Sequence, residues 1–132
     1  MKTKINWYIF NAFNQRLGRL ASVIACIIIG KHQINFSPHS YGDKVIIINA
    51  KHIILGGSKK KKKTYISYSG YPGGKKVKKV SELIKTRPEF IIRKAVLGML
   101  PKNYFKKKIK NLYIFPNNRH NIKNVNNVKY FY

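Results

Sequence analysis

The sequence predicts an α/β domain in which helices pack on a small, mainly parallel sheet. Segment 44–50 (Lys-Val-Ile-Ile-Ile-Asn-Ala) is a continuous apolar run, which is typical of a strand covered on both faces in a parallel sheet. Segment 17–29 repeats apolar residues at helical spacing, and segment 7–12 is aromatic and β-branched like a buried strand. We therefore expect helices packed against parallel strands.

The first half of the chain is expected to contribute two strands and the helix between them. Strand 7–12 leads through a turn into helix 17–29, and Gly30 lies near the C-cap position that ends this helix. Segment 37–43 contains Ser, Pro, Gly and Asp, which favour a loop, and strand 44–50 follows it.

The middle of the chain is expected to hold short strands and an unusual loop. A strand-like run at 52–55 ends at Gly56, and segment 64–68 alternates aromatic and polar residues as a half-exposed strand does. Segment 69–74 (Ser-Gly-Tyr-Pro-Gly-Gly) disfavours regular structure and permits close backbone approach, so we interpret it as a functional loop.

Helices and a last strand are expected after this loop. A short helix at 81–85 is expected to begin with its serine as cap, and Pro88 suits the first turn of helix 89–100. Segment 104–110 is basic and is expected to be helical, and segment 112–115 is expected to be a strand. The chain is interpreted as one domain, 1–132, with a core at about 7–115 and a basic, Asn-rich tail at 116–132.

The charge imbalance predicts a polyanionic partner. The 132 residues include 28 Lys+Arg against 3 Asp+Glu, giving a net charge of +25. Self-repulsion of this size opposes compact folding unless phosphates neutralise it. A hydrophobic content of 44% excludes a disordered basic tail. The charge is clustered, most densely in the lysine run 59–63, which taken alone would be a solvated loop.

Few residues are suited to catalysis or metal binding. We expect Glu82 and Glu89 to lie near helix starts, where carboxylates meet the helix dipole favourably, and Asp43 to pair with a lysine or to serve a turn. The four histidines lack metal-ligand spacing, and Cys26 is expected to be a small buried hydrophobic residue. Segment 56–59 lacks the spacing of a nucleotide-binding loop. We expect no enzyme activity, no metal, no cofactor and no small-molecule substrate.

Membrane insertion is not expected either. The longest apolar stretch, 21–29, is well short of the roughly twenty residues that cross a bilayer. The chain's start passes straight into a strand-like segment, without the apolar core of a signal peptide.

Aromatic residues interleaved with lysines favour RNA over duplex DNA. Exposed rings can stack on unpaired bases while lysines contact phosphates, and the sequence contains no recognition helix, zinc finger or basic zipper. Core packing is the competing interpretation of each ring, which we expect of Tyr65 and Tyr113 and leave open for Tyr68, Tyr71 and Tyr104.

Several short motifs follow one another along about residues 7–115. They are Trp7-Tyr8, Leu17-Gly18-Arg19-Leu20-Ala21, Gly30-Lys31-His32, Gly42-Asp43, Asn49-Ala50, Ser69-Gly70, Pro72-Gly73-Gly74 and Gly98-Met99-Leu100-Pro101-Lys102. The combination of Gly-Met-Leu-Pro-Lys after a helix with an upstream Ser-Gly-x-Pro-Gly-Gly is the most specific part. In order and spacing, these motifs resemble the universal large-subunit ribosomal protein family numbered thirteen, in its bacterial and organellar form.

This resemblance implies a three-layer α/β/α fold, no catalytic activity, and a place in the large ribosomal subunit, bound to its RNA beside other ribosomal proteins and acting early in assembly. Segment 103–106 departs from the glycine-containing stretch that the family usually has there. Segments 71–74 and 112–116 look closer to mitochondrial members, so a mitochondrial ribosome is favoured, with plastid or bacterial cytoplasm as alternatives. The alternative function is a non-ribosomal, basic nucleic-acid-binding protein.

The residues expected to contact RNA are basic side chains, which would meet phosphates, and the glycine-rich loop, whose backbone would approach the RNA. They are Arg16, Arg19, Lys31, His32, Lys59, Lys60, Lys61, Lys62, Lys63, Gly70, Tyr71, Gly73, Gly74, Lys75, Lys76, Lys102, Lys106, Lys107 and Lys108.

Overall fold

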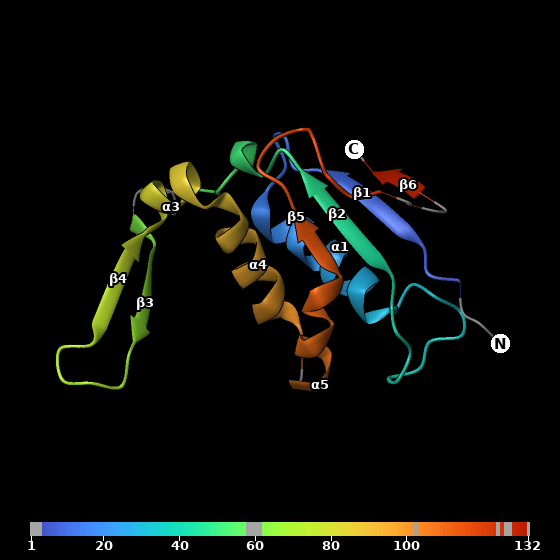
Figure 1. Ribbon diagram of the computed structural model, residues 1–132, viewed down its shortest axis with the longest axis horizontal. Helices are drawn as coiled ribbons and strands as arrows, with labels where there is room; N and C mark the ends of the chain where they lie inside the picture. Colours follow the sequence, from blue (N-terminus) through green and yellow to red (C-terminus); the bar gives the residue numbers. More distant parts are fainter. Residues whose placement is uncertain (1–3, 58–61, 102, 124, 126–127, 132) are drawn as a thin grey trace.

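A computed structural model of the chain describes residues 4–57, 62–101, 103–123, 125 and 128–131, and it is an α/β structure with a parallel sheet (Figure 1). The sheet has the order β5-β2-β1-β6, and its strands are β1 (Trp7–Asn11), β2 (Lys44–Ile48), β5 (Leu112–Ile114) and β6 (Val128–Phe131). A separate antiparallel hairpin consists of β3 (Thr64–Tyr68) and β4 (Lys75–Lys79). The helices are α1 (Leu17–Ile29), α3 (Val80–Thr86), α4 (Pro88–Met99) and α5 (Asn103–Lys106), with 3-10 turns η1 (Ala50–His52) and η2 (Lys107–Asn111). The predicted α/β class and parallel sheet are confirmed.

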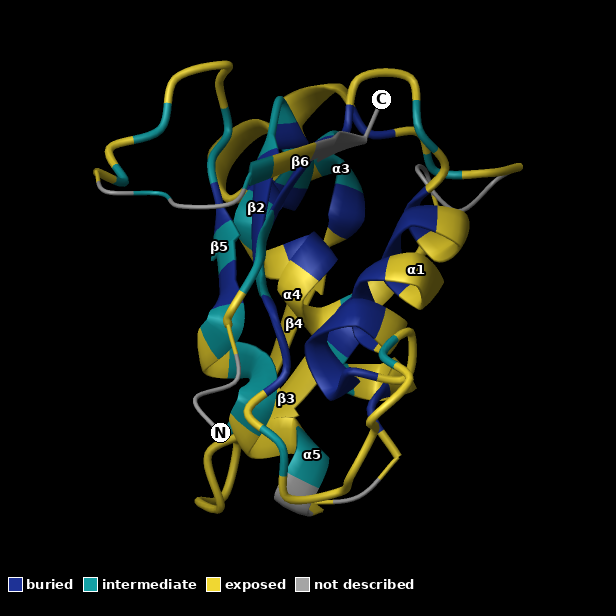
Figure 2. Ribbon diagram, turned by 90° about the vertical axis from the view of Figure 1, so that its right-hand side faces the viewer, coloured by how far each residue is buried: buried dark blue, intermediate teal, exposed yellow. Residues whose placement is uncertain are grey.

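Helices α1 and α4 pack side by side on one face of the sheet (Figure 2). The connections β1-α1-β2 and β2-α4-β5 step in the same direction across the sheet, and right-handed crossovers then place both helices on the same face. The core between the layers is built from strand and helix side chains that are buried together. They include Tyr8, Phe10, Val45, Ile47, Ile24, Ile28, Ile91, Ile92 and Val96.

The opposite face of the sheet carries the alternate side chains of the same strands. Ile9 and Ile46 are neighbours in the β1–β2 register and are both buried. The rings of Trp7 and Tyr113 lie on this face with their centroids 5.7 Å apart, and the Lys44 ammonium lies 4.9 Å from the Trp7 ring. In this part of the described structure, side chains rather than a further helix cover the sheet.

Strand β6 was not expected from the sequence, because it lies in the Asn-rich tail. Val128–Phe131 pairs with Trp7–Phe10 in parallel register and extends the sheet at the edge opposite β5. Its position depends on backbone pairing with β1, which local sequence patterns do not reveal. In addition, four residues are too few to show a clear apolar pattern.

Other local predictions differ from the structure. Cys26 is exposed, not buried, because it lies on the outer face of α1 with Arg19 and Ser22, three or four residues apart. The expected strand at 52–55 is limited to η1 and a single parallel bridge between Arg16 and Ile54. The cap expected from Ser81 is absent, since α3 begins one residue earlier, at Val80, with Lys79 in the cap position.

Asp43 links the start of β1 to the loop between α1 and β2. Its carboxylate is 1% exposed and accepts the backbone N–H of Asn6 at 3.0 Å and the side-chain amide of Gln33 at 3.1 Å. The imidazole Nε2 of His32 lies 2.7 Å from Oδ2, and the Tyr8 hydroxyl lies 3.3 Å from the same nitrogen. The prediction for Asp43 was a lysine partner or a role in a turn, and the observed side-chain partners are His32 and Gln33.

Gly42 is predicted to be irreplaceable, since its φ is +65° and an added Cβ would overlap the carbonyl oxygen of Ile28. We expect Gly42→Ala to destabilise the fold by about 2–5 kcal/mol, the sum of left-handed strain and overpacking. Gly98→Ala is the matched control, because a Cβ there meets nothing within 4 Å. Urea unfolding measures both, and equal midpoints for the two variants would contradict this prediction.

Candidate nucleic-acid interface

The hairpin β3–β4 forms an arm that projects away from the body of the protein (Figure 1). All five residues of β4 are exposed, and four of them are lysines: Lys75, Lys76, Lys78 and Lys79. The arm joins the body where the backbone N–H of Val80 donates to the carbonyl of Lys63 and where the rings of Tyr65 and Phe90 meet edge to face at 5.5 Å. The arm therefore presents a cationic ribbon beyond the compact core.

The predicted functional loop is the turn at the tip of this arm. The backbone N–H of Ser69 donates to the carbonyl of Gly74 at 3.1 Å, and the N–H of Gly74 donates to the carbonyl of Tyr71 at 2.9 Å. Gly70 and Gly73 have φ of +83° and +70°, so both positions need glycine. The turn is closed by these bonds, and its backbone is exposed at Gly70 and Gly73.

The three tyrosines of the arm have different surroundings: one packs on the body of the protein, and two are exposed. Tyr65 packs on the body, as expected, and burial raises the pKa of its phenol. Tyr68 and Tyr71 are 74% and 78% exposed. Core packing is thus excluded for Tyr68 and Tyr71, and their faces are available for stacking on bases.

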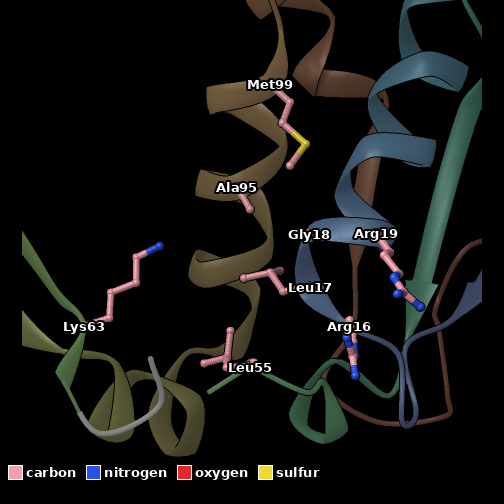
Figure 3. Close-up of a pocket in the computed structure, with 9 residues that line it drawn as sticks. Arg16, Leu17, Gly18, Arg19, Leu55, Lys63, Ala95 and Met99 are labelled. Carbon is pink, nitrogen blue, oxygen red and sulfur yellow. The ribbon is translucent and has the colours of Figure 1, made fainter. Parts of the chain in front are cut away.

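A second cationic region surrounds a pocket of about 440 Å³ between α1 and α4 (Figure 3). Three predicted contact residues meet there, namely Arg16 and Arg19 at the start of α1 and Lys63 at the base of the arm. The remaining lining residues are small or apolar: Leu17, Gly18, Leu55, Gly56, Ala95 and Met99. The pocket joins segments that are distant in the sequence.

A further cationic region, the α5–η2 region, lies where η2, which directly follows α5, meets the end of α1. Lys31, Lys106 and Lys107 are exposed. The Lys108 ammonium is turned towards the protein, where it donates to the carbonyls of Ile29 and Pro38, each at 3.4 Å. Partial burial lowers the pKa of Lys108.

Lys108 and His32 therefore have structural contacts in addition to any role at the interface. Lys108 bonds to the carbonyl of a residue at the C-terminus of α1, and His32 has its Nε2 beside the buried carboxylate of Asp43. Neither contact is visible in the sequence, because the partners are 79 and 11 residues away, respectively. Exposed neighbours on the chain, such as Lys31 and Lys107, remain better placed for phosphates.

Four predicted contacts, Lys59, Lys60, Lys61 and Lys102, lie outside the described residues. Lys62, at the edge of the same lysine run, is exposed. The predicted set omitted Lys78 and Lys79, although both lie on the exposed arm. The repeated pattern of lysines flanking Val77 could have indicated a strand with its basic side chains in solvent.

Within the described parts of the chain, His, Cys, Asp and Glu side chains form no group of three or more that could hold a metal ion. The helices found in those same parts are too short or too polar to span a membrane.

The sequence model of the family described as ribosomal protein L13 matches residues 5–121. The chain belongs to the ribosomal protein L13 family. It is similar to the large ribosomal subunit protein uL13 of Pelotomaculum thermopropionicum, with 51% identity over 98 residues, covering 74% of this chain and 68% of that protein. It is also similar to the proteins of the same name from Thermoanaerobacter sp. (strain X514) and Buchnera aphidicola subsp. Cinara cedri, with 45% and 46% identity, respectively, over 121 residues, covering 90% of this chain and 85% of each relative.

The part that matches the ribosomal protein L13 family contains the arm, the α1–α4 pocket and the α5–η2 region. Strand β6 lies beyond the matched residues. The cationic surface is thus carried by the family domain itself, and the relatives named above are bacterial.

Proposed function

We propose that this chain is a structural protein of the large ribosomal subunit, which binds the subunit's RNA through phosphate contacts and supports its assembly. The observation that carries the proposal is the cationic arm, β3–β4, on a chain of net charge +25 that belongs to the ribosomal protein L13 family. Its relatives are named as large ribosomal subunit proteins.

The proposed contacts fall in the regions described above. The arm supplies Lys75, Lys76 and the backbone of Gly70, Tyr71, Gly73 and Gly74, to which we add Lys78 and Lys79. The pocket region supplies Arg16, Arg19 and Lys63, and the α5–η2 region supplies Lys31, Lys106 and Lys107. Lys62, the exposed neighbour of Lys63 in the sequence, is also proposed as a contact. Lys59, Lys60, Lys61 and Lys102 stay in the proposed set, while Lys108 and His32 act mainly by positioning these segments.

The acidic residues support a binding role rather than catalysis. Asp43 is buried and bonded to Asn6 and Gln33, so it is unavailable to a substrate. Glu82 and Glu89 lie in the first turns of α3 and α4, as predicted, where they stabilise the helices through the helix dipole. These are all the carboxylate side chains in the sequence. We propose that the protein is not an enzyme.

Membership of the family does not determine the cellular compartment of the protein. The mitochondrial location favoured by segments 71–74 and 112–116 stays a prediction, with plastid and bacterial cytoplasm as alternatives, and the relatives named above are bacterial. Fractionation of the source cells into organelles and cytosol, followed by detection of this chain, decides among the three.

Replacing Lys59–Lys63 with serine tests phosphate binding by this run of the chain. Each lost lysine–phosphate contact should lower the salt slope of RNA binding by about one, because fewer counterions are released. The measurement is the dissociation constant for large-subunit ribosomal RNA at several salt concentrations. An unchanged slope would remove this lysine run from the interface.

The alternative, a non-ribosomal basic nucleic-acid-binding protein, makes a different prediction in the same assay. Charge alone would give duplex DNA of equal length the same affinity as structured RNA at physiological salt. A clear preference for ribosomal RNA supports the ribosomal function.

A further inference from the structure

We propose that the pocket between α1 and α4 receives one unstacked base of the ribosomal RNA, while the cations at its rim contact the flanking phosphates. The inference rests on the proposed function and adds to it the chemical class of the ligand. The pocket combines an apolar floor, a cationic rim and a volume of about 440 Å³.

The floor of the pocket is apolar and comes from both helices and from the chain before the arm. Leu17 projects from α1, Ala95 and Met99 from α4, and Leu55 lies below them, as Figure 3 shows. Met99 is exposed, and its unbranched thioether adapts well to a flat ring. An apolar floor of this kind would gain nothing from a phosphate alone, so the ligand should carry an apolar face.

The rim of the pocket is cationic on both sides. Figure 3 shows Lys63 on the side of the arm and Arg16 and Arg19 on the side of α1, where both arginine side chains project away from Leu17 and the apolar floor. All three are exposed, and the described lining includes no acidic residue. Charge complementarity therefore favours an anionic ligand whose negative charges lie at the rim of the pocket and not on its apolar floor.

A single nucleotide within an RNA strand meets both requirements. The base has an apolar face for the floor, and the phosphates on its two sides can reach the rim. In an intact duplex both faces of each base are stacked, so the base must come from a bulge, a loop or a single strand, which is how proteins commonly recognise RNA. The volume lies within the usual range of small-ligand pockets, about 300–1,000 Å³.

Gly18 offers a way to fill the pocket without changing its charge. It lines the pocket on α1, and a Cβ there would meet nothing within 4 Å. We expect Gly18→Leu to occupy the space of the base, and the fold should tolerate it because leucine is a better helix former than glycine. Gly98→Leu is the matched control, because Gly98 also lies in a helix with open space around it but outside the pocket lining.

The test compares two RNA probes of equal charge, a riboadenosine decamer and an abasic ribose-phosphate decamer, by fluorescence anisotropy with the full chain. The wild-type protein should prefer the decamer with bases by about 5- to 150-fold, the range expected when one base is bound by stacking. Gly18→Leu should abolish most of this preference and leave the affinity for the abasic strand unchanged. Gly98→Leu should keep the preference.

Two results would overturn the inference while leaving the proposed function intact. The first is a Gly18→Leu variant that keeps the wild-type preference for bases, which would assign stacking to other rings such as Tyr68. The second is an equal loss of affinity for both probes, which would mean that the RNA backbone, not a base, occupies this site. By contrast, failure of the wild-type protein to bind either probe in a salt-dependent manner would count against the proposed function itself.

Discussion

A variant in which Lys75, Lys76, Lys78 and Lys79 are all serine should bind large-subunit ribosomal RNA about 10²- to 10³-fold more weakly at 0.15 M salt, because its salt slope should fall by about three to four. The four lysines lie on β4, where every residue is exposed. Their backbone pairing with β3 does not involve the side chains, so serine should preserve the arm. Titration at several salt concentrations gives both quantities.

A control variant that loses four lysines elsewhere distinguishes the effect of the arm's position from the effect of a lower net charge. Lys4, Lys51, Lys85 and Lys123 are exposed and belong to no proposed contact region. Changing these four to serine lowers the net charge equally and should alter the slope much less. Equal losses for the two variants would show that the arm has no special position at the RNA.

Asp43→Ala is expected to destabilise the protein by about 2–5 kcal/mol, because donors that share this buried carboxylate lose their acceptor, and each buried donor left unsatisfied costs about 1–3 kcal/mol. The Asn6 N–H and the Gln33 amide would lose their acceptor, and His32 would lose its carboxylate partner at 2.7 Å. These contacts join the start of β1 to the α1–β2 loop, so the loss should appear as global unfolding at a lower urea concentration. The measurement is best made at 0.5 M salt, where self-repulsion among lysines is screened.

Glu82→Ala is the matched control for this measurement. It removes one negative charge, as Asp43→Ala does, but from an exposed position in the first turn of α3. We expect a loss of about 0.3–1 kcal/mol from the helix dipole. A loss for Asp43→Ala no larger than that for Glu82→Ala would contradict the structural role assigned to the buried carboxylate.

Local sequence patterns predicted most of the fold because the core elements are strongly patterned. Strand 44–50 and helix 17–29 have apolar runs of the right length and period, and Pro88 marked the start of α4. The helical period also explains why the predicted burial of Cys26 was wrong. A mostly apolar helix still has a solvent-facing side, and Cys26 lies on it. Strand β6 escaped prediction because its partner, β1, is more than one hundred residues away in the sequence.

The candidate interface could be predicted as a set of basic residues but not as a surface. The glycine-rich loop was recognised from its composition, whereas the arm became visible only when β4 was seen to pair with β3. The α1–α4 pocket joins Arg16, Lys63 and Met99, which the crossover connections bring together. Tertiary contacts also decide which basic side chains face solvent, as Lys108 shows.

The most direct test of the ribosomal function is sedimentation of a native lysate through a sucrose gradient, with detection of this chain before and after a wash at about 0.5 M salt, which removes purely electrostatic binders. The proposed function predicts that the chain stays with the large subunit through the wash. Its absence from the large-subunit peak would contradict the ribosomal function and leave a non-specific binder of polyanions as the explanation of the charge.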